Sequence, residues 1–101
     1  MVTYPLSLEI EFEGRMRQVY EDAKEHAGYN ASRFLQMVNR RGGIEAAHRL
    51  LAAKATSPGF DRLFAAGFKH LCVEAVILEE RFTPLFTHAE REVARHRLAG
   101  S

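Results

Sequence analysis

Apolar residues recur along most of the chain at spacings of three and four, which is the period of one face of an α-helix. The longest such stripe runs from Leu8 to Ala27, and it predicts a helix with Ser7 as N-cap and Gly28 at its C-terminus. A period-two pattern, typical of a strand, competes over the first dozen residues at Tyr4, Leu6, Leu8, Ile10 and Phe12. The helix is favoured because its stripe continues well past these positions, but the first dozen residues stay open between helix, strand and disorder, with residues 1–7 as the candidates for an extended or disordered start.

Glycine, proline and capping residues divide the rest of the chain into shorter helices. Asn30 is the predicted N-cap of a second helix that stops at the glycine pair 42–43, where one glycine takes the left-handed conformation and the other starts a third helix. The segment 57–59 breaks the chain after that helix, and Pro58 suits the first turn of a fourth, which closes at Gly67.

The last third of the chain begins with its most apolar segment. Residues 68–80 predict one helix that is apolar on most sides and therefore central to the fold. The aromatic segment 82–86 is expected to be a loop that plugs the core. Thr87 and Glu90 have the spacing of a capping box, which predicts the start of a last helix.

These elements predict an all-α fold, a compact bundle of about five to six short helices in a single domain over residues 1–101. A length of 101 residues with 47% hydrophobic content is typical of one globular domain and argues against intrinsic disorder. The terminal Gly100–Ser101 is consistent with a remnant of cloning and carries no weight in this prediction.

The single cysteine, Cys72, excludes an internal disulfide framework and a cysteine-rich zinc site. The N-terminal residues lack the basic start and apolar run of a secretory leader, and the longest apolar stretch, 71–78, is too short for a membrane span and contains Glu74. A cytoplasmic location without a membrane partner is therefore expected. Cys72 falls within the apolar set of its helix, so we expect a buried thiol rather than a catalytic one.

The net charge of +1 conceals a separation of charge along the chain. Residues 1–26 carry a net charge of −3, residues 27–73 of +5 and residues 74–101 of −1. Because the total is balanced, the chain lacks the general basic footprint of nucleic-acid-binding proteins, and any such contact depends on the basic middle segment.

Candidate anion- or nucleic-acid-binding residues lie on the second and third helices, at Arg33, Gln36, Arg40, Arg41 and Arg49. The first three share the polar face of the second helix, and the arginine pair 40–41 precedes the third helix, whose N-terminal amides suit a phosphate. The favoured alternative is a solvated helix face with arginines that pair with the acidic first helix. The same two helices also fit a helix-turn-helix, although their turn suits any helical hairpin.

No catalytic residue, metal site or cofactor is predicted. His88, Glu92 and His96 are spaced four apart on the last helix, but the two histidines lie two turns apart, so an exposed face with Glu–His pairs is preferred to a metal site. His70 and Glu74 are expected to form a partly buried pair. No motif supports an enzyme, and a metal-dependent one on the last helix is a remote alternative.

The most concentrated polar cluster consists of Tyr29, Asn30, Ser32 and Arg33. A hydrophobic staple at Tyr29 and a cap at Asn30 explain most of this cluster structurally, whereas Arg33 lacks an obvious structural task. The cluster is therefore also a candidate recognition surface.

Several segments of the chain resemble a bacterial family of small helical proteins of about this length that have no established activity. These segments are GYNASRFLQMV at 28–38, GGIEAAHRLL at 42–51, SPGFDRLF at 57–64, LCVEAVILEERFTPLFT at 71–87 and EVARHRL at 92–98. The residues that match the family pattern are Tyr29, Arg33, Phe34, Met37, Gly42, Gly43, Phe60, Glu74, Phe86, Thr87 and Glu90. Residues 68–70 depart from it. The resemblance extends over 16–98 and implies one helical unit without naming its chemistry.

We therefore expect a small non-enzymatic binding protein that acts through protein–protein contacts, with nucleic-acid binding as the alternative. Val2, Tyr4 and Ile10 are apolar positions of the N-terminal segment outside the main stripe. A homodimer is expected to cover them, because an isolated core of this size is marginal.

Overall fold

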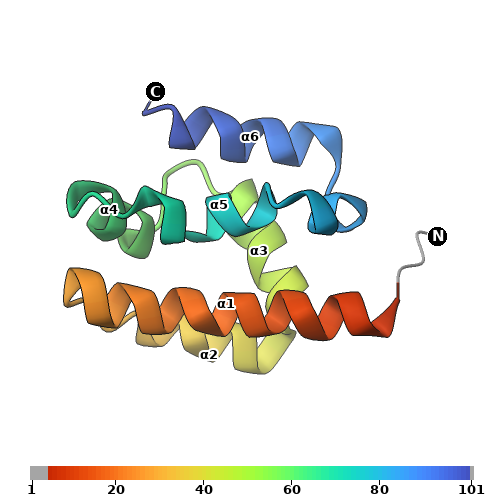
Figure 1. Ribbon diagram of the computed structural model, residues 1–101, viewed down its shortest axis with the longest axis horizontal. Helices are drawn as coiled ribbons and strands as arrows, with labels where there is room; N and C mark the ends of the chain where they lie inside the picture. Colours follow the sequence, from red (N-terminus) through yellow and green to blue (C-terminus); the bar gives the residue numbers. More distant parts are fainter. Residues whose placement is uncertain (1–4, 101) are drawn as a thin grey trace.

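The computed structural model describes residues 5–100, and every regular element in this range is helical (Figure 1). The elements are, in chain order, α1 (Leu6–Ala27), α2 (Ser32–Arg41), α3 (Gly43–Ala52), α4 (Pro58–Ala65), the 3₁₀ helix η1 (Lys69–Leu71), α5 (Val73–Ile77), the 3₁₀ helix η2 (Glu80–Leu85) and α6 (His88–Leu98). The predicted all-α class is confirmed. The strand alternative is wrong for the described part of the N-terminal segment, because α1 already includes Leu6.

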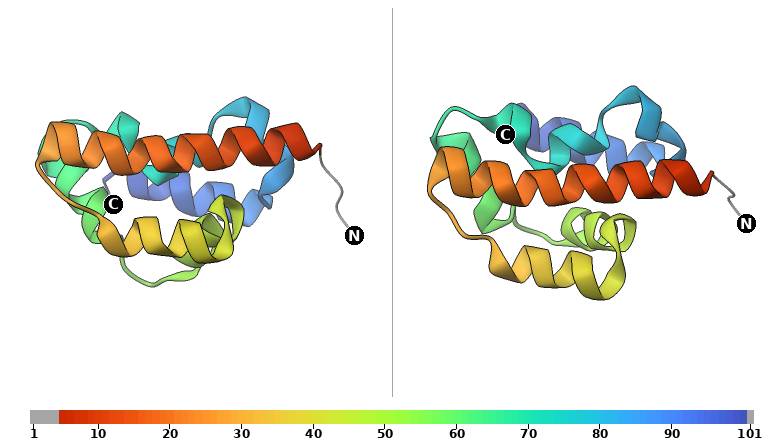
Figure 2. Two further views of the ribbon diagram at one scale, coloured as in Figure 1. Left: turned by 90° about the horizontal axis from the view of Figure 1, so that it is seen from below. Right: turned by 60° about the horizontal axis from the view of Figure 1, so that its bottom comes forward.

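The helices stack in layers, with α6 on one side, α4 and α5 in the middle, and α1 with α2 on the other side (Figure 1). Two further views show α1 and α2 side by side and antiparallel (Figure 2). The third helix, α3, runs from the end of α2 towards α6, and α1 contacts α2, α3, α4 and α5. The long first helix is therefore the element against which most others pack.

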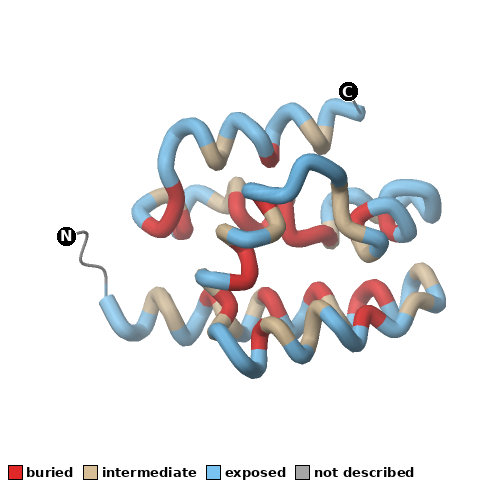
Figure 3. The backbone as a smooth tube through the Cα atoms, turned by 180° about the vertical axis from the view of Figure 1, so that it is seen from behind, coloured by how far each residue is buried: buried red, intermediate tan, exposed pale blue. Residues whose placement is uncertain are grey.

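The length of α1 follows from its uninterrupted apolar stripe. The positions of this stripe that are fully or almost fully buried are Phe12, Met16, Val19 and Ala23. Gly28 ends the helix with a φ of 63°, a left-handed conformation that a residue without a Cβ adopts at little cost. A trace coloured by burial shows the same pattern, with buried residues on the inward side of each helix (Figure 3).

The start of α1 differs from the prediction. Pro5, not Ser7, is the N-cap, and the carbonyl oxygen of Pro5 accepts hydrogen bonds from the amides of Leu8 and Glu9. The helix therefore includes residues 6 and 7, and Ser7 lies exposed within its first turn. Proline suits this position because its fixed φ, here −61°, leads directly into the first turn.

The aromatic segment 82–86 fills the core, as predicted. The ring of Phe12 lies 5.0 Å from that of Phe82 in an edge-to-face contact and 5.3 Å from that of Phe86. Phe82, Leu85 and Phe86 are all buried. The prediction of a loop is wrong in detail, because residues 80–85 form the 3₁₀ helix η2.

The second helix starts later than predicted. Its N-cap is Ala31, and α2 begins at Ser32. Asn30 does not cap the helix, because its side-chain oxygen accepts a hydrogen bond from the hydroxyl group of Tyr20, at 2.8 Å. A contact with α1 thus replaces the local capping bond that the sequence indicates.

The predicted continuous helix over 68–80 is wrong, although its central position is confirmed. Cys72 has an extended backbone, with a ψ of 171°, and its Sγ donates to the carbonyl oxygen of Lys69, which favours a break over a further helical turn. The break divides the apolar residues of this segment into two sets that pack in different core clusters. Leu71, Cys72 and Ala75 pack with Leu63, whereas Val73, Val76 and Ile77 of α5 pack with Phe12 in the larger core cluster.

Two other helix starts agree with the sequence. The hydroxyl oxygen of Ser57 accepts from the amide of Phe60, and Pro58 occupies the first turn of α4. Thr87 and Glu90 form both hydrogen bonds of a capping box at the start of α6. These motifs need only neighbouring residues, so local sequence suffices to predict them.

The glycine pair at 42–43 brings α3 close to α1. Gly42 has a positive φ of 86°, as predicted for one of the two glycines, and Gly43 starts α3. A Cβ added at Gly43 would lie 3.0 Å from the Cα of Glu13, a backbone atom that cannot swing aside. Glycine at 43 is therefore a requirement of the α1–α3 contact.

We expect Gly43→Ala to lower the free energy of unfolding by about 1–3 kcal/mol, because α1 and α3 must separate to admit the methyl group. Gly14→Ala is the matched control, since a Cβ at this α1 position meets nothing within 4 Å in the single chain, and both variants are compared at a protein concentration at which the chain is monomeric. This control should raise the free energy of unfolding by about 0.5–1 kcal/mol through helix propensity. Urea unfolding of both variants measures the difference, and equal effects would show that the contact tolerates a side chain.

Candidate functional site

The five candidate anion-binding residues all lie exposed on α2 and α3. Arg33, Gln36 and Arg40 share one face of α2, as their spacing indicates, while Arg41 ends the helix. Arg49 lies on α3, where its Nε donates to Glu45 at 3.1 Å. The structure thus brings the candidate residues of α2 together, whereas Arg49 is paired with Glu45.

The N-terminus of α3, the predicted phosphate position, already faces a carboxylate. The amide of Gly43 donates to Oε1 of Glu13 at 3.0 Å. Arg17 holds the same carboxylate through its other oxygen, and it also donates to the side-chain oxygen of Asn39 on α2 at 2.6 Å. A side chain of α1 therefore meets the positive end of the α3 dipole. The predicted pairing of the basic-segment arginines with α1 is wrong for the described residues, because Arg49 pairs with Glu45 and no arginine of α2 forms an ion pair with an acid of α1.

Two further charges of α1, Arg15 and Glu11, meet the C-terminal part of the chain. Arg15 donates to Glu79 at 2.6 Å, and Arg81 bridges Glu79 and Glu11. Burial opposes ionisation of Glu79, but hydrogen bonds from Arg15 and Arg81 outweigh it and hold the pKa of this carboxyl below its ordinary value. These ion pairs hold Glu79 and Arg81, which follow α5 in the chain, against α1.

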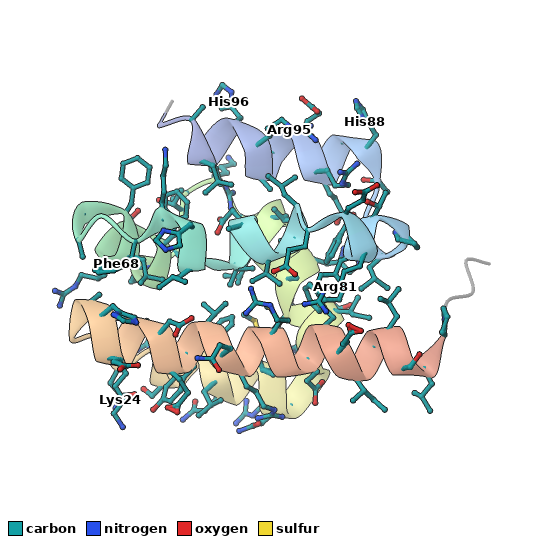
Figure 4. The ribbon with its side chains drawn as sticks, in the orientation of Figure 1. Lys24, Phe68, Arg81, His88, Arg95 and His96 are labelled. Atoms are coloured by element: carbon teal, nitrogen blue, oxygen red, sulfur yellow. The ribbon has the colours of Figure 1, made fainter. Side chains whose placement is uncertain are left out.

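The residues considered for a metal do not converge. Figure 4 shows His88 and His96 well apart along the outer side of α6, and Glu92 between them pairs with Arg95. Among residues 5–100, the group of three acidic or histidine residues whose ligand atoms all lie within 4.8 Å of one another consists of Asp22, Glu25 and His26, at the end of α1.

This α1 group escaped the sequence analysis, although its spacing of three and four was visible. Asp22 and His26 of this group both have structural partners. One Asp22 oxygen accepts from Gln18 at 2.9 Å, and the His26 ring stacks on Phe68 at 4.8 Å.

The predicted pair of His70 and Glu74 is wrong. Glu74 is buried and accepts a hydrogen bond from Arg97 of α6 at 3.0 Å. The same guanidinium donates to the carbonyl oxygens of Leu50 and Ala53, at the C-terminus of α3. The backbone break at Cys72 is the reason, because His70 and Glu74 no longer share one helix.

The best-formed concave site is an apolar cavity of about 440 Å³ between α1, α2 and α4. Its apolar wall consists of Val19, Ala23, Ala31, Phe34, Met37, Leu50, Pro58, Gly59, Phe60, Leu63, Cys72 and Val73. Its polar lining consists of Tyr29, Asn30, Ser32, Arg33 and Ser57. The polar cluster singled out from the sequence thus lies together at this cavity, although no sequence signal indicated that α4 would face it.

Cys72 contributes an uncharged wall to the cavity. Burial raises the pKa of the Cys72 thiol to about 12, from an ordinary value of 9.0, and the thiol donates to the carbonyl oxygen of Lys69 at 2.9 Å. The sulfur is thus protonated near neutral pH and packs as a small apolar group, which confirms the predicted burial of Cys72.

We expect the Cys72 thiol to make the protein less stable in alkali. Its folded-state pKa lies above the unfolded value, so its contribution is complete below pH 9.0 and declines as the unfolded chain ionises at higher pH. The free energy of unfolding should fall by up to about 1.4 kcal/mol per pH unit from this group. Urea unfolding between about pH 8 and about pH 11 should give a shallower decline for Cys72→Ala, and parallel curves would contradict the assignment.

Comparison of the chain with protein-family models, curated proteins and solved structures finds no match. The resemblance to a bacterial family of small helical proteins therefore stays a prediction. Between residues 5 and 100, none of the helices has both the length and the apolar character needed to cross a bilayer.

Proposed function

We propose that this protein is a small non-enzymatic binding protein that takes apolar side chains of a partner protein into the cavity between α1, α2 and α4. The observation that carries the proposal is the cavity itself, an apolar space with a few polar groups gathered at one place. Its volume of about 440 Å³ lies within the range of roughly 300–1,000 Å³ that is usual for ligand pockets.

The composition of the wall supports a protein segment as occupant. Phe34, Met37 and Leu50 are only half-buried, so apolar surface of α2 and α3 stays open to contact. Methionine adapts its shape to different partners, and a groove lined in this way suits the apolar face of an amphipathic segment. We also infer a cytoplasmic location, the compartment in which a protein with one unpaired cysteine is commonly found.

Nucleic-acid binding through Arg33, Gln36, Arg40, Arg41 and Arg49 is the weaker proposal. A phosphate at the α3 N-terminus would have to displace Glu13 from the amide of Gly43. Arg49 is already paired with Glu45, and the net charge of the chain is only +1. Of the five residues, Arg33, Arg40 and Arg41 are the cations that stay without an ion pair within residues 5–100 and can meet a phosphate backbone.

A variant that fills the cavity tests the main proposal. Gly59 lines the cavity, and a Cβ there would lie 4.0 Å from the Tyr29 ring, so Gly59→Leu should place its side chain at this wall without a clash. Selection from a random peptide display library on the full-length chain should enrich peptides with apolar residues. Gly59→Leu should weaken the binding of an enriched peptide by at least about tenfold, measured by calorimetry.

Ala65→Leu is the matched control, because Ala65 is an exposed residue of the same helix outside the cavity wall. It should bind the enriched peptide as tightly as the wild type. Failure to enrich apolar peptides, or equal binding by Gly59→Leu, would contradict the proposed function.

We propose in addition that the outer face of α1 joins two copies of the chain. Leu6 and Ile10 are 68% and 65% exposed, and Gly14 follows on the same face with open space above it. In an antiparallel crossing of two such helices, Ile10 of each copy can sit over Gly14 of the other, which makes the face self-complementary. Val2 and Tyr4, the other residues expected at this contact, lie outside the described residues.

Size-exclusion chromatography with light scattering should therefore give a mass about twice the 11.5 kDa of the chain at high protein concentration. Ile10→Glu should shift the protein to 11.5 kDa, because each copy would then bury an unpaired carboxylate against Gly14 of the other. A wild type that elutes only as a monomer would refute the dimer and leave the cavity proposal untouched.

A further inference from the structure

The charged side chains at the cavity are positive. Arg33 is the charged residue of its lining, which contains no carboxylate. A second cation, Arg62 of α4, lies over the ring of the cavity residue Tyr29 at 5.3 Å. The neighbouring acid, Asp61, is turned to a different partner, since it accepts the hydroxyl hydrogen bond of Thr56 at 2.5 Å. The mouth of the cavity is therefore basic.

The chain does not neutralise these two cations. Across residues 5–100, neither Arg33 nor Arg62 forms a side-chain hydrogen bond or an ion pair. The arginines that do pair with acids are Arg15, Arg17, Arg49, Arg81, Arg95 and Arg97. Arg40, Arg41 and Arg91 also lack an acidic partner among residues 5–100, but Arg33 and Arg62 are the unpaired arginines at the cavity.

Arg33 also differs from the other arginines of α2 in its position along the helix. Arg40 and Arg41 lie in the last turn of α2, where a cation favourably meets the negative end of the helix dipole. Arg33 lies at the second residue of α2, at the positive end, and no acidic side chain occupies that first turn. A cation at this place stabilises neither the helix nor an internal pair, so helix stability does not explain it.

We infer that the cavity recognises partner segments in which an aspartate or glutamate flanks the apolar anchor residue, with Arg33 as the principal contact for the carboxylate and Arg62 as the second. This inference rests on the proposed function and specifies its partner. The apolar side chain fills the space over Val19 and Leu63, and the adjacent carboxylate lies at the guanidinium of Arg33, which can hold two carboxylate oxygens at once.

The peptide selection described above also tests this inference when it is repeated with Arg33→Gln and Arg40→Gln. Both variants remove one positive charge from an exposed position of α2, but only Arg33 lines the cavity. Wild type and Arg40→Gln should enrich acidic residues beside the apolar anchor, whereas Arg33→Gln should enrich the anchor alone. Circular dichroism checks that each variant keeps its helical content.

The enriched peptide and its Glu→Gln counterpart then give the size of the effect. The acidic peptide should bind the wild type about fivefold more tightly, and high salt should reduce this preference. Arg33→Gln should bind both peptides equally. Apolar peptides without any acidic preference would overturn this inference and leave the proposed function standing, whereas the absence of apolar enrichment would overturn both.

Discussion

The buried pair of Glu74 and Arg97 is the interaction on which the arrangement of the C-terminal half depends. Their side chains are 3% and 10% exposed, so both charges have left water and need each other. The Arg97 guanidinium also donates hydrogen bonds to two backbone carbonyl oxygens at the C-terminus of α3, those of Leu50 and Ala53. A single side chain of α6 therefore fixes α5 and α3 together, and satisfies carbonyl groups at the end of α3 that the helix itself leaves free.

Charge compensation by α1 complements this pair on the other side of the molecule. Glu13 meets the N-terminus of α3, and Arg15 and Glu11 meet the Glu79–Arg81 segment. Among residues 5–100, the ion pairs of the α1 acids are made with α1 itself and with Arg81, and none is made with a cation of the basic segment 27–73. Arg33 and Arg62 at the apolar cavity between α1, α2 and α4 therefore stay without an acidic partner, which is informative about what binds there.

Sequence reasoning succeeded where the physical cause is local. The α1 stripe, the first-turn position of Pro58 in α4 and the Thr87–Glu90 capping box each depend on residues within a few positions, and each is present. It failed at Asn30 and over 68–80, where Tyr20 and the Cys72 thiol offer competing hydrogen bonds. The polar cluster 29–33 was visible as a candidate site. Its cavity was not, because the walls from α4 and Cys72 are distant in sequence and meet it only through tertiary packing.

The contacts of α1 also set the order in which the chain can fold. Phe12 packs on Phe82, Arg15 reaches Glu79 across 64 positions, and Glu11 reaches Arg81 across 70. The apolar stripe of α1 packs first on α2, α3 and α4, which follow it directly in the chain, whereas the part of its core in residues 73–86 comes late. Completing the core therefore requires the closing of a long loop, whose entropy cost slows folding.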